Sequence, residues 1–167
     1  MQSLYHEYLK APSRSNYLIL RDACLNDADY DPCSRELDAI EHLVEEGVWD
    51  LAGLAIGDAL PNLLLSPRLH LLAAHVSRAQ GHHDAAEFES ATALALVQGI
   101  LSTGDGSKDT PYLVTRTSDE VDVCQRLGKF SERHLPQHKD GRNLDELKTS
   151  DGDAIWFDMT EPYHRYA

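Results

Sequence analysis

The stretch GVWDLAGLAIGDAL (residues 47–60) is matched in register by the stretch GHHDAAEFESATAL (residues 81–94). At an offset of 34 positions, seven pairs of residues in and before these stretches are identical: Leu37 with Leu71, Ala39 with Ala73, Gly47 with Gly81, Asp50 with Asp84, Ala52 with Ala86, Ala59 with Ala93 and Leu60 with Leu94. Glycine tolerates the positive φ of a tight turn between helices, and alanine lets two helices approach closely. The spacing therefore predicts a helical hairpin that occurs twice.

The region from Ser34 to Ile100 repeats apolar residues at steps of three and four, which is the spacing of a helix face. It predicts four helices, whose apolar faces hold Leu37, Ile40, Leu43 and Val44; Leu51, Leu54, Ala55 and Ala59; Leu69, Leu72, Ala73 and Val76; and Ala86, Ala93, Leu94 and Val97. A capping side chain followed by proline signals a helix start. We therefore expect the first helix to begin near Pro32 and the third near Pro67.

A 34-residue unit with glycine and two alanines at these offsets resembles the tetratricopeptide repeat. The resemblance covers about residues 33–97 and gives two degenerate repeats, at about residues 33–65 and 67–99. It departs from the family pattern at Glu36 and His70, where the family has a large aromatic residue. The resemblance implies a row of helical hairpins whose first helices line a concave, partner-binding face.

That face would form a groove for a protein or peptide, lined by Leu37, Glu41, Val44, Glu45, Arg68, Leu71, His75 and Arg78. One half of the groove would be acidic and the other basic. Arg68 and Arg78 would then bind a carboxylate of the partner, since guanidinium groups recognise carboxylates well. The alternative is that these residues form solvated helix faces, or that the N-terminal helices fill the groove.

Two repeats are few for a stable array, so flanking helices should cover the ends. QSLYHEYLK (residues 2–10) and SNYLILRDACL (residues 15–25, capped by Ser15) fit that role. We therefore expect a helical domain over residues 1–103 and a small α+β segment over residues 104–167 that packs on it.

The second segment begins with the turn-rich linker STGDGSKDTP. We expect a strand in YLVTRT (residues 112–117) and a short helix in SDEVDVCQRLG (residues 118–128). Ser118 would cap that helix, its inward residues being Val121, Cys124 and Leu127.

Two Asp-Gly turns, at residues 140–141 and 151–152, predict hairpins around RNLDELKT and AIWFDMT. The segment then forms a small antiparallel β-meander. The fold class is α+β, mainly α. The pattern GDGS…PYLVTRTSDE…LG resembles a bacterial family of unknown function, and this resemblance implies nothing about chemistry.

The formal net charge of −13 at pH 7 limits the classes of binding partner that the sequence favours. It disfavours nucleic acid and anionic membrane surfaces, and it suits a basic protein partner.

Asp58 and Pro61 interrupt the most apolar stretch, Leu51–Leu65, so we expect no membrane span. The N-terminal residues show no signal-peptide pattern, and the three widely spaced cysteines suit a reducing compartment. We expect a cytoplasmic protein.

Candidate metal ligands and catalytic groups form no complete set. Asp27, Asp29, Asp31 and Asp38 are spaced somewhat like a calcium loop, but Pro32 occupies the position that needs glycine. His134 and His138 flank Pro136, which argues against a helix, and Cys124 would be their one added ligand. No nucleotide-binding or nucleophile motif is present. We expect no metal, no cofactor and no catalytic residue.

The sequence thus favours a non-catalytic helical-repeat protein that binds a protein or peptide. An acidic regulatory or inhibitor subunit of the immunity type, covering a basic partner, is the alternative from another class. A third alternative is an enzyme whose site has no familiar motif. The identity of the partner and the oligomeric state stay open.

Overall fold

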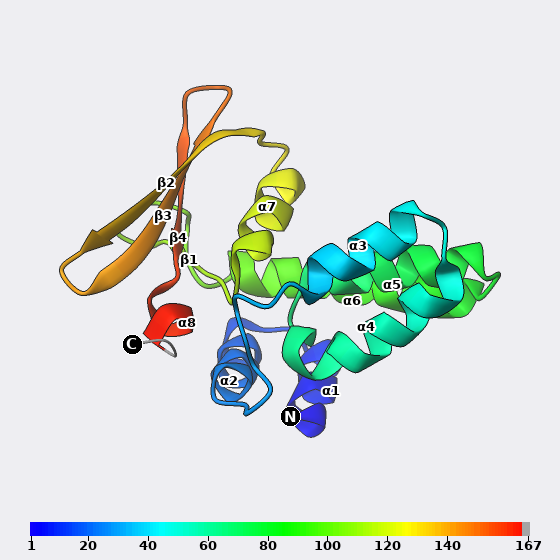
Figure 1. Ribbon diagram of the computed structural model, residues 1–167. Helices are drawn as coiled ribbons and strands as arrows, with labels where there is room; N and C mark the ends of the chain where they lie inside the picture. Colours follow the sequence, from blue (N-terminus) through cyan, green and yellow to red (C-terminus); the bar gives the residue numbers. More distant parts are fainter. Residues whose placement is uncertain (165–167) are drawn as a thin grey trace.

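Helices α3 (Glu36–Glu45), α4 (Trp49–Leu63), α5 (Pro67–Ala79) and α6 (His83–Leu101) form two consecutive hairpins (Figure 1). The computed structural model describes residues 1–164, apart from the side chains of residues 131, 132 and 139. Within that part of the chain there are eight helices and one four-stranded sheet. The predicted fold class, α+β and mainly α, is confirmed.

The two hairpin turns form as the glycines predict. Gly47 has φ +69° and Gly81 has φ +82°, both in the left-handed region that favours glycine. The four alanines that recur on the second helices of the hairpins are all buried, with exposed fractions of 2% or less: Ala52, Ala59, Ala86 and Ala93. Small side chains therefore lie where neighbouring helices meet.

Of the two predicted helix starts, one is confirmed and one is wrong. Ser66 caps α5, since its hydroxyl accepts the backbone N–H of Leu69 at 3.3 Å. Helix α3 begins at Glu36 rather than near Pro32. The carboxylate of Asp31 accepts the Cys33 N–H at 2.9 Å, and this hydrogen bond holds the Asp-Pro segment in a turn.

Helices α1 (Gln2–Lys10) and α2 (Arg14–Leu25) lie against α6, as expected of covering helices. The N-cap of α2 is Ser13, not Ser15, and its hydroxyl accepts the Asn16 N–H at 3.2 Å. The contact with α6 is centred on Gly99. A Cβ atom there would lie 2.3 Å from Tyr17 Cδ2 and 2.6 Å from the Tyr8 hydroxyl oxygen.

The C-terminal half contains β1 (Tyr112–Leu113), α7 (Thr117–Arg126), β2 (Ser131–Lys139), β3 (Arg142–Thr149), β4 (Ala154–Asp158) and α8 (Thr160–His164). Strands β2, β3 and β4 form the predicted antiparallel meander. The sheet order is β1-β4-β3-β2, and β1 pairs with β4 in parallel, so the whole sheet is mixed. Both Asp-Gly turns occur where predicted, with φ +76° at Gly141 and φ +87° at Gly152.

The predicted strand over residues 112–117 is wrong beyond Leu113. The next residues leave the sheet because they bind elsewhere. Both the N–H and the hydroxyl of Thr115 donate to Asp119, and Arg116 donates to the backbone oxygen of Asn62 at 2.9 Å. Helix α7 therefore starts at Thr117, and its N-cap lies two residues before the predicted one.

The larger core cluster joins the N-terminal helices to the sheet. It includes Tyr8, Tyr17 and Ile100 from the helices, and Val114 and Phe157 from the C-terminal half. A smaller cluster lies within the hairpins, around Ile40, Ala59, Leu63 and Leu69. Figure 1 shows α7 between the sheet and the hairpins. Within residues 1–164, no helix has the length and apolar character needed to cross a bilayer.

Candidate functional site

Helix α7 turns its acidic residues inward, which differs from the predicted orientation. Of the residues expected to face the core, Val121 and Leu127 are exposed by 44% and 40%, and Cys124 alone is buried. The inward face instead carries the acids Asp119, Glu120 and Asp122. Arg116, not Ser118, is the N-cap. Carboxylates can be buried in this way only where other groups compensate their charge.

Arg68 compensates the charge of Asp122. Its Nε and one terminal nitrogen donate to Asp122 Oδ1 at 2.9 and 2.6 Å, and the other terminal nitrogen donates to Glu41 at 3.1 Å. Burial raises the pKa of the Asp122 carboxyl to about 6, against the lowering effect of Arg68. The arginine that we expected to bind a partner is therefore engaged within the protein.

The structure divides the predicted groove into a partly covered half and an open half. Leu37 and Val44 are half-buried against the smaller core cluster. Leu37, Glu41 and Arg68 line a cavity of about 200 Å³, and the first turn of α7 forms part of its wall. Helix α7, rather than α1 or α2, thus borders this half.

The open half of the groove lies toward the ends of α3 and α5. Glu45, Leu71, His75 and Arg78 are all exposed there. The ring of His75 lies against Trp49, with 5.5 Å between the ring centroids. Of the predicted groove residues, these four are the exposed ones.

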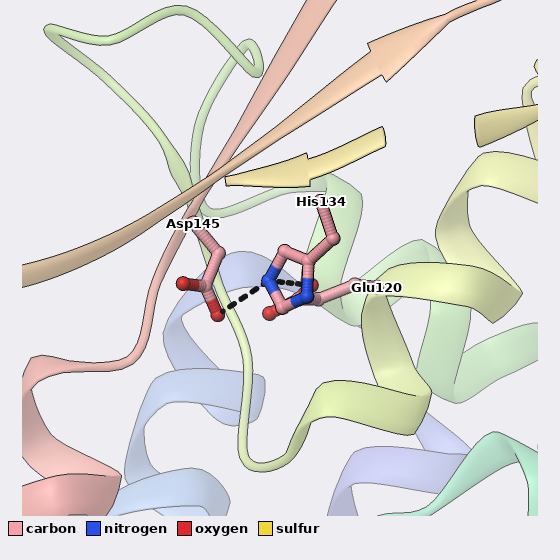
Figure 2. A group of neighbouring side chains, drawn as sticks. All are labelled: Glu120, His134 and Asp145. Carbon is pink, nitrogen blue, oxygen red and sulfur yellow. Dashed lines mark ion pairs between the residues drawn. The ribbon is translucent and has the colours of Figure 1, made fainter. Parts of the chain in front are cut away.

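A second group of polar residues meets where α7 faces the sheet. Figure 2 shows Glu120 from α7, His134 from β2 and Asp145 from β3 with their side chains directed toward one another. His134 Nε2 lies 3.2 Å from Asp145 Oδ2 and 3.6 Å from Glu120 Oε2. The two carboxylate side chains are exposed by only 2% and 4%, whereas that of His134 is 45% exposed. Two buried carboxylates therefore share one partly exposed imidazole.

The environment of Glu120 disfavours its charged form. Burial, followed by the neighbouring charge of Asp145, raises the pKa of the Glu120 carboxyl to about 10. Within the described residues, Glu120 Oε1 has no hydrogen-bond partner. A carboxylate in this position needs either a proton or a cation beside it.

Sequence reasoning missed this group. It paired His134 with His138 and Cys124, but residues four apart on a strand lie about 13 Å apart. His138 instead contacts Asn143 Oδ1 at 2.7 Å, and Cys124 is buried. Among the described residues, Glu120, His134 and Asp145 are the one group of three such side chains whose donor atoms lie within 4.8 Å of one another. The acidic residues around Asp31 do not form such a group.

One signal in the sequence could have found two of the three residues. The Asp-Gly turn at residues 140–141 sets the register of β2 and β3, in which Pro136 pairs with Asp145 and His134 with Leu147. Asp145 is therefore the diagonal neighbour of His134 on the same face of the hairpin. Glu120 had no such signal, because it joins them only through the packing of α7.

In the comparisons with known proteins, no family model matches the chain, and neither a curated protein nor a solved structure matches it.

Proposed function

We propose that this chain is a non-catalytic protein-binding molecule and that its helical hairpins, α3 to α6, make the contact. The distribution of exposed apolar side chains carries this proposal. Of the eleven large apolar side chains exposed in the described part of the chain, seven belong to the hairpin region: Val48, Leu51, Leu54, Leu60, Leu71, Phe88 and Leu94. Single exposed leucines are ordinary, but a concentration in one region is typical of interaction surfaces.

The three most exposed of these seven side chains, Leu51, Leu54 and Phe88, lie on α4 and α6. Leu51 and Leu54 sit one turn apart on α4, with exposed fractions of 53% and 67%. They belong to the face that the sequence pattern assigned as apolar, and they are exposed nonetheless. On α6, Phe88 (55%) and Leu94 (43%) are likewise exposed. Covering a large apolar side chain stabilises a complex by about 1.5–3 kcal/mol before the costs of association.

Exposed acids accompany these apolar residues, including Asp58 on α4 and Glu87 on α6. With a net charge of −13, the whole chain would also attract a basic partner. The partner that fits is therefore a protein segment with apolar anchors and basic neighbours. Nucleic acid and anionic membranes are not part of the proposal, since the charge repels both.

The tetratricopeptide resemblance also favours the hairpins as the binding region, and it adds a second binding face to the proposal. On the first helices of the hairpins, Leu71, His75 and Arg78 stay open to a partner. We also place the protein in the cytoplasm, because Cys24, Cys33 and Cys124 are all free thiols in the described structure.

The test is affinity capture of binding proteins from the native cell extract with matched surface variants. Leu54→Ser with Phe88→Ser removes the outer apolar residues, and Leu71→Ser with Arg78→Ala removes the open groove residues. Ile19→Ser on α2 is the control, since Ile19 is 52% exposed and lies outside the hairpins. We expect at least one protein that the wild type and the control capture equally and that a hairpin variant loses. Identical capture by all four proteins would contradict the proposal.

The acidic-subunit alternative keeps one observation in its favour, which is the charge of −13 itself. A partner held by charge alone would be retained by both hairpin variants, and its binding would weaken steeply with salt.

A further inference from the structure

We propose that Glu120, His134 and Asp145 bind one divalent first-row transition-metal ion, of the class that includes Zn²⁺. This site is separate from the hairpin surface and does not depend on the proposed function. Its three ligands come from α7, β2 and β3, so the ion would fasten the helix to the sheet.

The distances between the donor atoms suit a single ion. Ligand atoms that bind Zn²⁺ at about 2.0–2.2 Å in tetrahedral or octahedral geometry lie roughly 3.0–3.5 Å apart. His134 Nε2 is 3.2 Å from Asp145 Oδ2 and 3.6 Å from Glu120 Oε2. The three donor atoms all lie within 4.8 Å of one another, so small side-chain rotations would complete the site.

The charges at the site call for a cation. In the described part of the chain, no lysine or arginine pairs with Glu120 or Asp145; each has an ion pair with His134 alone. Glu120 Oε1 is buried and has no hydrogen-bond partner there. Two carboxylates buried side by side need a proton or a cation between them, and a divalent ion would neutralise both at once.

The donor set also limits which ion fits. One imidazole and two carboxylates suit a borderline ion such as Zn²⁺, whereas Ca²⁺ takes six to eight oxygen ligands. The half-exposed His134 gives the ion a path from solvent. Three protein ligands leave at least one position for water, which is the arrangement of open rather than closed zinc sites.

The test is calorimetric titration of Zn²⁺ into the metal-free full chain carrying Cys33→Ser, which removes the exposed thiol as a competing ligand. We expect one Zn²⁺ per chain. His134→Ala and Glu120→Gln should each weaken binding by at least about 100-fold, because even residues that only support metal ligands are commonly worth 10–100-fold. The matched control is His138→Ala, which changes an exposed histidine on the same strand and should bind as the parent does.

Thermal unfolding supplies a second readout that is independent of the calorimetric titration. Zn²⁺ should raise the Tm of the parent and of His138→Ala by several degrees and leave the Tm of Glu120→Gln unchanged. Without metal, Glu120→Gln should melt no lower than the parent, since glutamine keeps the side-chain shape and, like a protonated carboxyl group, carries no charge. The proposed site would be overturned if the parent bound no Zn²⁺. It would also be overturned if either ligand variant bound Zn²⁺ as the parent does.

Discussion

At the scale of single residues, two glycines within helices differ in whether the surrounding packing requires glycine. Gly99 on α6 lies where Tyr8 and Tyr17 pack, and there is no room for a Cβ atom. Gly57 on α4 has no atom within 4 Å of the position that a Cβ would take. The first glycine is required by packing, and the second is not.

Gly99→Ala should therefore destabilise the protein by about 1–3 kcal/mol, because the tyrosines must move to admit the methyl group. Gly57→Ala is the matched control and should stabilise by up to about 1 kcal/mol, through helix propensity alone. Urea denaturation measures both. Equal effects of the two substitutions would show that the contact between α6 and the N-terminal helices is not as described.

Arg68 is a structural residue on this account, although the sequence predicted a partner-binding role. Arg68→Ala leaves Asp122 buried without its cation, so it should lower the free energy of unfolding by about 1–3 kcal/mol. Arg78→Ala, at an exposed position on the same helix, should leave stability within about 0.5 kcal/mol. Thermal melting of the two variants side by side decides the matter. If Arg68→Ala melts like Arg78→Ala, the pair with Asp122 contributes nothing.

At the scale of elements, the hairpins depend on small residues where helices cross. Ala52 and Ala86 are buried at 0% and 1% exposure. Ala52→Leu or Ala86→Leu should overpack these contacts and destabilise by about 1–3 kcal/mol. Ala91→Leu, at an exposed position on α6, supplies the control and should be close to neutral. An unchanged Tm in both the Ala52→Leu and the Ala86→Leu variant would contradict the close packing of helices at these two alanines.

The elements that sequence predicted well are those that local signals specify. Gly47 and Gly81 marked the hairpin turns, Ser66–Pro67 marked the start of α5, and the Asp-Gly turns marked the meander. The orientation of α7 could not be predicted, because Asp122 is buried only by virtue of Arg68, 54 residues earlier in the chain. The parallel pairing of β1 with β4 likewise depends on contacts distant in sequence.

The candidate metal site was predictable only in part, for the same reason. The hairpin register brings His134 next to Asp145, and a turn of two residues sets that register. Glu120 completes the group through tertiary packing of α7, which leaves no trace in the local pattern. Periodicity in fact pointed the other way, since it assigned Val121 and Leu127 to the inward face.

At the scale of the whole molecule, one core crosses the boundary that the sequence placed near residue 104. Tyr8 and Tyr17 from the first helices share a cluster with Val114 and Phe157 from the second half. The two halves should therefore unfold together as one cooperative unit. Trp49 and Trp156 report on the hairpins and on the sheet respectively, so the variants Trp49→Phe and Trp156→Phe each leave one fluorescent probe. The two probes should show the same transition midpoint; midpoints separated by several degrees would mean that the halves unfold independently.

On the proposed function, apolar side chains on the helical hairpins hold a partner, and charge plays a lesser part. The salt dependence of the Kd tests this most directly, using the partner captured by the wild type and lost by the Leu54→Ser, Phe88→Ser variant. We expect the Kd to change less than about tenfold between low and high salt, because screening acts on charges and not on apolar contacts. A wild-type Kd that rises steeply with salt would contradict it and favour an acidic subunit that covers a basic partner.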